Sequence, residues 1–244
     1  MSKIIFSAFL NSRGRPALLE NALDSLYATC SDAESLETLV RCDSDDLETI
    51  EFLKTADYPN LRYFVGPRPS NLIESYNELV SKAVGEYLFV LNDDVQILTE
   101  NFDLIALEKI DDFKRKYKIW DNVLMCSTSD TSIDKTAGQK YSSFVIISKE
   151  AVMALGYFMN EKYVTLGADA HISRIYYAID RVVDCSDILL DHIFHNDLNK
   201  VLNPDLTAHE YRQKAWITSP DPFSFDITEE VNKLKKYISN DANN

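Results

Sequence analysis

A short, wholly apolar segment that ends abruptly at carboxylates constrains this chain more than any other feature. Gly85 precedes the run 87–91, Tyr-Leu-Phe-Val-Leu, and Asn92, Asp93 and Asp94 follow it directly. A run this short and apolar, bounded by a glycine and by polar residues, predicts a buried strand with acids at its C-terminal end. Open α/β sheets bind ligands at that edge. Carboxylates suit Mg²⁺ or Mn²⁺, which usually bind through one or two carboxylates plus ligand phosphates. The segment therefore predicts a metal-dependent nucleotide site.

Turn and cap residues divide the first part of the chain into alternating strands and helices. Pro16 suits the first turn of a helix, Asn71 with Glu74 predicts a capping box, and Gly85 is interpreted as a helix C-cap. The expected strands are 3–10, 36–42, 61–65 and the segment 85–95, and the expected helices are 16–27, 47–57 and 71–84. This alternation predicts a mostly parallel sheet with right-handed crossovers, the first half of a doubly wound α/β fold.

Beyond residue 95 the pattern is looser. We expect a charged helix at 101–118, a short helix at 149–155 that ends at Gly156, a helix from Gly167 to 179 and a modest helix near 227–239. The expected strands are 123–127 and 144–148, and two short extended segments follow at 181–185 and 188–195. The polar segment 128–141 has no clear period and is interpreted as a mobile lid. The polar end, 240–244, is expected to fray.

Composition narrows the class of protein. With 244 residues, 45% of them hydrophobic, the chain can bury one sizeable core with at most a small appendage. A net charge of -14 without a basic patch disfavours nucleic acid and anionic lipid as partners. The four cysteines lack zinc-site spacing, which is typical of core thiols in a reducing compartment. The apolar run at the N-terminus is too short for a signal peptide or a membrane span. We therefore expect a cytoplasmic protein without membrane insertion.

Several short motifs occur in a characteristic order. The loop 11–16 reads Asn-Ser-Arg-Gly-Arg-Pro, the turn 41–46 reads Arg-Cys-Asp-Ser-Asp-Asp, and 76–94 joins a helix to the strand that ends in Asn-Asp-Asp. Leu-Gly-Tyr-Phe at 155–158, Gly-Ala-Asp at 167–169 and Asp-His-Ile-Phe-His at 191–195 follow. Each motif alone is weak, but in this order, over roughly residues 3–196, they resemble the GT-A class of glycosyltransferases, in particular the inverting, family-2-like enzymes.

The resemblance implies a single GT-A, Rossmann-like α/β domain at 1–200, with a mostly parallel central sheet flanked by helices. Its nucleotide-binding half would be about 1–95 and its acceptor-binding half about 96–200. Residues 201–244 would form a C-terminal extension, with a short helical tail, packed on the domain.

The resemblance also assigns roles to the residues near the donor. Asp94 would bind the metal, Asp93 would contact the ribose hydroxyls or an outer-sphere water, and Asp43 would accept a hydrogen bond from the base. Ser12 and Arg13 would line the base and phosphate pocket, and Arg68 would approach the diphosphate. Asn92 stands where the family's Asp-x-Asp motif has its first acid, so Asp94 carries most of the metal assignment. On the residues alone an alternative stays open, in which Asp43 and Ser44 cap a helix and Arg13 and Arg15 are solvated loop cations.

The later motifs supply a base and a second metal ligand. An inverting transferase needs a base near the acceptor hydroxyl, and Asp169 is the candidate implied by the resemblance, with Glu161 and His171 as substitutes. A first-turn Asp is often only a helix cap, which is the alternative. His192 is favoured over His195 as a metal ligand, because residues three apart in an extended segment face opposite sides. The aromatic residues of the region, Tyr157, Phe158, Tyr163, Tyr176 and Tyr177, could stack on sugars but are more often core residues.

The expected activity is glycosyl transfer in glycan biosynthesis. A sugar would move from a nucleotide-diphosphate donor, with a UDP-sugar favoured, to a hydroxyl of a glycan, protein or lipid-linked acceptor, with inversion and with Mn²⁺ or Mg²⁺ as cofactor. Two alternatives stay open. One is a sugar-nucleotide nucleotidyltransferase, although the loop 11–16 has one glycine and arginines in place of a Gly-rich loop with a lysine. The other is an inactive sugar-nucleotide-binding module, which Asn92 would suit.

Overall fold

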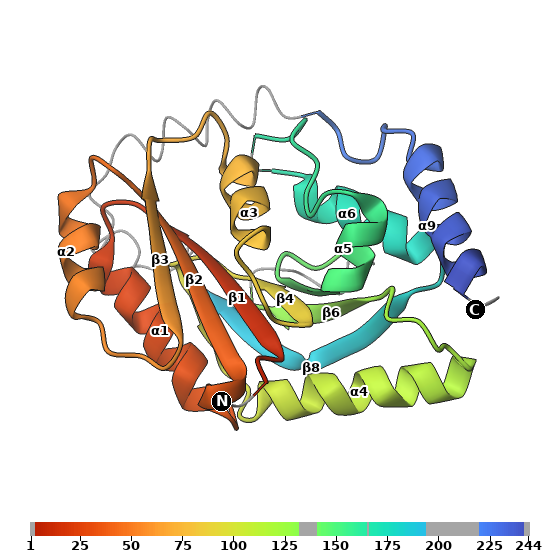
Figure 1. Cartoon of the computed structure of the whole chain (residues 1–244), viewed down its shortest axis with the longest axis horizontal. Helices are drawn as coiled ribbons and strands as arrows, with labels where there is room; N and C mark the ends of the chain where they lie inside the picture. The colour runs from red at the N-terminus through yellow and green to blue at the C-terminus, as the bar shows by residue number, and fades with distance from the viewer. Residues whose placement is uncertain (1–2, 132–140, 165, 194–219, 242–244) are drawn as a thin grey trace.

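The computed structural model describes residues 3–131, 141–164, 166–193 and 220–241, which form one eight-stranded sheet with helices on both faces (Figure 1). The strand order is β3-β2-β1-β4-β7-β6-β8-β5. The strands β1, β2, β3 and β4 are parallel, β7 is antiparallel to both β4 and β6, and β8 is parallel to β6. Six strands therefore share one direction, which confirms the mostly parallel α/β sheet.

The first half of the chain contains the alternating strands and helices that its turn and cap residues predict. They are β1 (Phe6–Ser12), α1 (Pro16–Thr29), the short 3₁₀ helix η1 (Ala33–Ser35), β2 (Leu36–Asp43), α2 (Leu47–Thr55), β3 (Leu61–Gly66), α3 (Leu72–Val80) and β4 (Tyr87–Val90). Pro16 opens α1 as expected. Asn71 caps α3 by accepting a hydrogen bond from the Glu74 amide at 2.8 Å, while the Glu74 carboxylate accepts one from the amide of the preceding residue, Ser70, at 3.2 Å.

Gly85 does not cap a helix, so that interpretation was wrong. Helix α3 already ends at Val80, and Gly85 is not among the glycines with positive φ. Its amide donates to Ser7 Oγ at 2.9 Å, and a Cβ built on it would lie 2.5 Å from that oxygen and 2.8 Å from the carbonyl carbon of Phe6. A glycine stands here because two backbones approach closely, not because the chain needs a left-handed residue.

The second half contains β5 (Val95–Ile97), α4 (Phe102–Tyr117), β6 (Met125–Asp130), β7 (Val145–Ser148), α5 (Lys149–Leu155), α6 (Ala168–Ala178), β8 (Val182–His192) and α9 (Thr228–Asp241). The expected pair of extended segments, 181–185 and 188–195, is instead one strand, β8. Ser186 and Asp187, both exposed, lie where its register with β6 shifts, so an irregularity within the strand resembles a turn in the sequence. Residues 128–130 of the expected lid belong to β6, and 132–140 lie outside the described residues.

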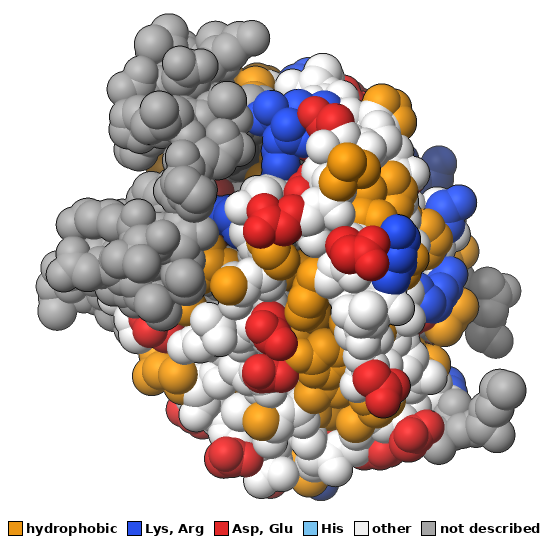
Figure 2. Space-filling model, turned by 90° about the vertical axis from the view of Figure 1, so that its left-hand side faces the viewer, with side chains coloured by type: hydrophobic (Ala, Val, Ile, Leu, Met, Phe, Trp, Pro, Cys, Tyr) orange, Lys and Arg blue, Asp and Glu red, His pale blue; other side chains and the backbone are white. Residues whose placement is uncertain are grey.

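Side chains that alternate along the strands belong to two hydrophobic cores, one on each face of the sheet. On β1, Phe6, Ala8 and Leu10 join the core beneath α1, α2 and α4, whereas Phe9 joins the core beneath α3, α5, α6 and α9. This two-sided burial explains why the central strands are almost wholly apolar. At one edge of the sheet, β3 exposes Tyr63 and Val65. Figure 2 shows a band of hydrophobic side chains on one face of the molecule, with acidic side chains along it. None of the helices in the described ranges has the length and hydropathy of a membrane span.

Because β1, β2, β3, β4, β6 and β8 point the same way, their C-terminal ends meet along one edge of the sheet. That edge gathers the residues that end these strands, Ser12, Asp43, Gly66, Asp130 and His192, and the two acids that come shortly after β4, Asp93 and Asp94.

Candidate functional site

Two buried carboxylates at the end of β4 are held by one arginine. Asp93 is fully buried and Asp94 is 2% exposed. Arg15 donates from Nε to Asp93 Oδ2 at 3.0 Å, contacts Asp93 Oδ1 through Nη2, and reaches Asp94 Oδ2 through Nη1 at 3.4 Å. Burial raises the pKa of Asp93 to about 6, against the opposing charge of Arg15. The interpretation of Arg15 as a solvated cation is thus wrong.

His192 completes this group from the other half of the sheet. Val95 pairs with His192, and the Ile193 amide donates to the Asp94 carbonyl at 2.9 Å, so β8 ends beside the acidic turn. The Nε2 atom of His192 lies 3.6 Å from Asp94 Oδ1. A cation bonded to both atoms at about 2.1 Å would place them roughly 3 to 3.6 Å apart, so the pair fits a divalent metal.

The described residues provide few ligands for such an ion. Within the described ranges no group of three or more His, Cys, Asp or Glu side chains could hold a metal. An ion at Asp94 and His192 would therefore take its remaining ligands from water and phosphate oxygens, as Mg²⁺ commonly does. His195 lies outside the described residues, so the structure places only His192 of the two candidate histidines.

Asn92, which stands at the position of the motif's first acid, is turned toward helix α3. Its Oδ1 contacts the hydroxyl of Tyr76, and the same hydroxyl lies 2.6 Å from the Leu91 carbonyl oxygen. Burial raises the pKa of Tyr76, so this hydroxyl stays a neutral donor. Asn92 thus fastens the acidic turn to α3.

The turn after β2 brings together the residues expected at the donor base. Arg13 donates to Asp43 at 2.9 Å and to both oxygens of Asp45, at 2.5 and 2.9 Å. The Arg13 hydrogen bond is the main reason why the pKa of Asp45 falls to about 2. Asp46, not Asp43, caps α2, so the capping alternative for Asp43 is wrong. Ser12 is buried at the end of β1, in register with Cys42 of β2.

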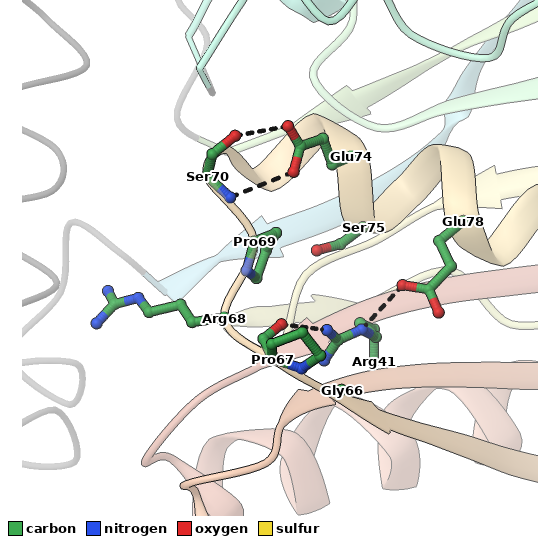
Figure 3. Close-up of a pocket in the computed structure, with 9 residues that line it drawn as sticks. All are labelled: Arg41, Gly66, Pro67, Arg68, Pro69, Ser70, Glu74, Ser75 and Glu78. Carbon is green, nitrogen blue, oxygen red and sulfur yellow. Dashed lines mark hydrogen bonds and ion pairs between the residues drawn. The ribbon is translucent and has the colours of Figure 1, made fainter.

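A pocket of about 330 Å³ adjoins this turn, between the end of β3 and α3 (Figure 3). Arg41 forms its floor, donating to the Pro67 carbonyl at 2.6 Å and to Glu78 at 3.1 Å, while its Nη1 lies 3.6 Å from Asp43. Arg68 belongs to the rim, and its side chain points away from Arg41 and Glu78. Its charge helps to lower the pKa of Asp45, which associates Arg68 with the β2 turn rather than with Asp94.

Asp169 is associated with the same edge of the sheet, because its carboxylate interacts electrostatically with that of Asp130. It lies in the first turn of α6, after Gly167, and burial raises its pKa to about 6, with the charge of Asp130 adding to the shift. Asp130 ends β6, is buried, and pairs with Leu190, two residues before His192. Burial raises the pKa of Tyr141, and the charges of both carboxylates add to that shift. The sequence reasoning missed Asp130, although it ends a strand just as Asp43 does.

The two alternatives to Asp169 as the base, His171 and Glu161, are less suitably placed for that role. His171 is 1% exposed, and its Nδ1 and Nε2 lie 3.2 and 3.5 Å from the hydroxyls of Tyr163 and Tyr157. Glu161 is exposed and accepts a hydrogen bond from Asn77 at 2.9 Å. Of the aromatic residues, Phe158, Tyr163 and Tyr176 are core residues, as the alternative interpretation has it.

Comparison with known proteins identifies the family of this chain. The family described as Glycosyl transferase family 2 matches residues 5–133, more than half of the chain. The chain belongs to this family and is a glycosyltransferase with the GT-A fold. A search of curated protein sequences gave no match.

Solved structures share the fold at low sequence identity. The mannosyltransferase PcManGT from Pyrobaculum calidifontis, in complex with GDP-Man and Mn²⁺, is similar with a TM-score of 0.63 at 13% identity, over 98% of this chain and 70% of that one. TarS from S. aureus gives 0.60 at 16% identity, over 93% of this chain but 45% of that one. Residues 1–349 of TarS in complex with UDP-GlcNAc give 0.57 at 16% identity, over 92% and 74%.

Proposed function

We propose that this glycosyltransferase moves a sugar from a nucleotide-diphosphate donor to an acceptor hydroxyl with inversion. The observation that carries the proposal is the approach of His192 Nε2 to Asp94 Oδ1, at 3.6 Å, beside the Arg15–Asp93 ion pair at the carboxyl edge of the sheet. Carboxylate and imidazole side by side, with open positions for phosphate oxygens, suit a divalent cation that also holds a diphosphate.

The base and phosphates of the donor would lie over the turns that follow β1 and β2. Asp43 would accept a hydrogen bond from the base, Ser12 and Arg13 would line the same pocket, and Asp93 would contact the ribose hydroxyls or an outer-sphere water. Arg68, on the rim beside Asp45, would meet the donor from the β3 side. We favour a UDP-sugar; a TarS structure holds UDP-GlcNAc and the PcManGT structure holds GDP-Man.

Departure of the diphosphate needs charge neutralisation. The chemistry that Mn²⁺ or Mg²⁺ supplies when bound at Asp94 and His192 is stabilisation of the negative charge that grows on the leaving group. Arg15, already at the same carboxylates, would add a positive charge from the chain itself.

Asp169 would act as the base. Its raised pKa of about 6 leaves it ionised at pH 7 and makes it a stronger base than an ordinary aspartate. Removal of the hydroxyl proton as the acceptor oxygen attacks from the side opposite the diphosphate would give inversion. The acceptor would be a glycan, a protein or a lipid-linked precursor. The four cysteines are all free thiols, which supports the expected reducing, cytoplasmic compartment.

The test combines binding with stereochemistry. Nucleotides and nucleotide sugars are screened by thermal shift with and without Mn²⁺, and the donors that bind are followed for hydrolysis and transfer. We expect a metal-dependent rise in melting temperature for a diphosphate nucleotide, through binding linkage, and slow release of free sugar. The anomer of the product, read by NMR, should be opposite to that of the donor. A protein that binds no nucleotide, or a product that retains the donor anomer, contradicts the proposal.

A further inference from the structure

Arg15 occupies a central place among the acidic groups of the site. It is the N-cap residue of α1, its carbonyl accepts hydrogen bonds from the Leu18 and Leu19 amides, and its side chain is 14% exposed. The start of α1 therefore fixes the guanidinium where β1 and β4 end. Both oxygens of Asp93 and the Oδ2 atom of Asp94 face it.

This geometry places two kinds of partner on one carboxylate. Oδ1 of Asp94 faces His192, on the side expected to receive a divalent cation, while Oδ2 faces Arg15 at 3.4 Å. A guanidinium and a metal ion that share a carboxylate repel each other, because both are positive and the carboxylate is almost wholly removed from water. Arg15 also neutralises Asp93, so the pair of acids offers a cation less negative charge than its two carboxylates suggest.

We propose that Arg15 is a positioning residue that holds Asp93 in a two-point ion pair and competes with the divalent cation for Asp94. The inference rests on the proposed function, because it takes Asp94 and His192 as the metal ligands. Arg15 keeps the affinity of the free enzyme for a cation low. Guanidinium groups bind phosphate oxygens well, so a bound diphosphate draws Arg15 away from Asp94 and lifts the competition.

The experiment measures binding of Mn²⁺ alone, by the EPR signal of the free ion, without nucleotide. Arg15→Gln should bind Mn²⁺ about tenfold more tightly than the wild type, because a positive charge beside Asp94 is removed. Arg13→Gln is the matched control, since it removes the same charge from the same loop but from Asp43 and Asp45. We expect it to change the affinity by less than about twofold. Equal or weaker binding by Arg15→Gln overturns the inference.

A second comparison covers the case in which Arg15→Gln does not fold, since it leaves the carboxylate of Asp93 buried without its partner. Asp93→Asn and Arg15→Gln/Asp93→Asn lack that charge. The double variant should bind Mn²⁺ more tightly than Asp93→Asn, because Arg15 still faces Asp94 in the single variant. Equal or weaker binding by the double variant again overturns the inference.

Failure of this inference is distinguishable from failure of the proposed function. Tighter Mn²⁺ binding by Arg15→Gln, in an enzyme that transfers no sugar from any donor, supports the role of Arg15 and rejects the proposed reaction. An active, metal-dependent enzyme whose Mn²⁺ affinity is unaffected by Arg15→Gln supports the reaction and rejects the role of Arg15.

Discussion

The Nε2 atom of His192 lies 3.6 Å from Oδ1 of Asp94, although His192 ends β8 and Asp94 lies in the turn between β4 and β5, in the other half of the chain. The hydrogen bond from the Ile193 amide to the Asp94 carbonyl, at 2.9 Å, joins the two backbones at this point. The separation of the two side chains is therefore set by main-chain pairing and not by loop conformation. Such a pair is held ready for a ligand, which is the condition for a precise binding site.

His192→Ala should weaken binding of Mn²⁺ by about tenfold or more, because one of two ligands from the chain is lost. The same substitution should lower the free energy of unfolding by only about 1 kcal/mol, because the ring, 20% exposed, loses an edge-on contact with Phe144. Titration of Mn²⁺ followed by EPR measures the affinity. His195→Ala is the control that separates the two histidines of the motif, and an equal loss in both variants would contradict the assignment of His192.

Asp169→Asn should preserve donor binding and remove turnover, since an amide accepts no proton. In the wild type the pKa of about 6 predicts the direction of the pH dependence. The base works only when ionised, so kcat/KM should be level above about pH 7 and fall about tenfold per pH unit below about pH 6. Asp130→Asn removes a charge that raises this pKa, so its acid limb should move to lower pH. An acid limb in the same place in the Asp130 variant would contradict the electrostatic contact.

The parts of this site that were predictable share one property. Asp43 and Asp94 each come at or shortly after the end of a strand-like segment, so their places near strand ends are visible in the sequence. Parallel topology brings strand ends together. Asp130 has the same place in the fold but was missed. The strand before it carries Ser127, Thr128 and Ser129, and small polar residues hide the boundary between strand and loop.

Arg15 and Gly85 show a second limit. The partners of Arg15, Asp93 and Asp94, are far along the chain, and no local pattern indicates that its charge is buried rather than solvated. Gly85 satisfied the local pattern for a helix cap, but a glycine is required there because the backbone of β1 approaches it closely, and β1 is equally remote in sequence. Local patterns predicted the helices, strands and strand ends well, whereas contacts between segments far apart in the sequence could be identified only in the three-dimensional structure.

His171 should make the stability of the protein depend on pH. Burial lowers its pKa below the unfolded value of about 6.5, against the opposing charge of Glu230 and with Arg174 and Lys162 lowering it further. Between the lowered pKa and about 6.5 the unfolded chain binds more protons, so the free energy of unfolding should fall as the pH is lowered through that range. His171→Asn should flatten this part of the profile, measured by urea unfolding from pH 7.5 to about pH 5. An unchanged slope in the variant would reject His171 as the source.

Gly85→Ala should destabilise the fold by about 3 kcal/mol, the upper end of the range for overpacking. The added Cβ would lie 2.5 Å from Ser7 Oγ and 2.8 Å from the Phe6 carbonyl carbon, and a backbone within a central strand cannot move aside as a flexible side chain can. Gly14→Ala is the matched control, because Gly14 has a φ of +63° but no atom within 4 Å of the added Cβ. It should cost about 1 kcal/mol, from the left-handed backbone alone. Urea unfolding of the three proteins separates the two causes, and a Gly85→Ala variant no less stable than Gly14→Ala would show that β1 and the Gly85 backbone do not require a glycine between them.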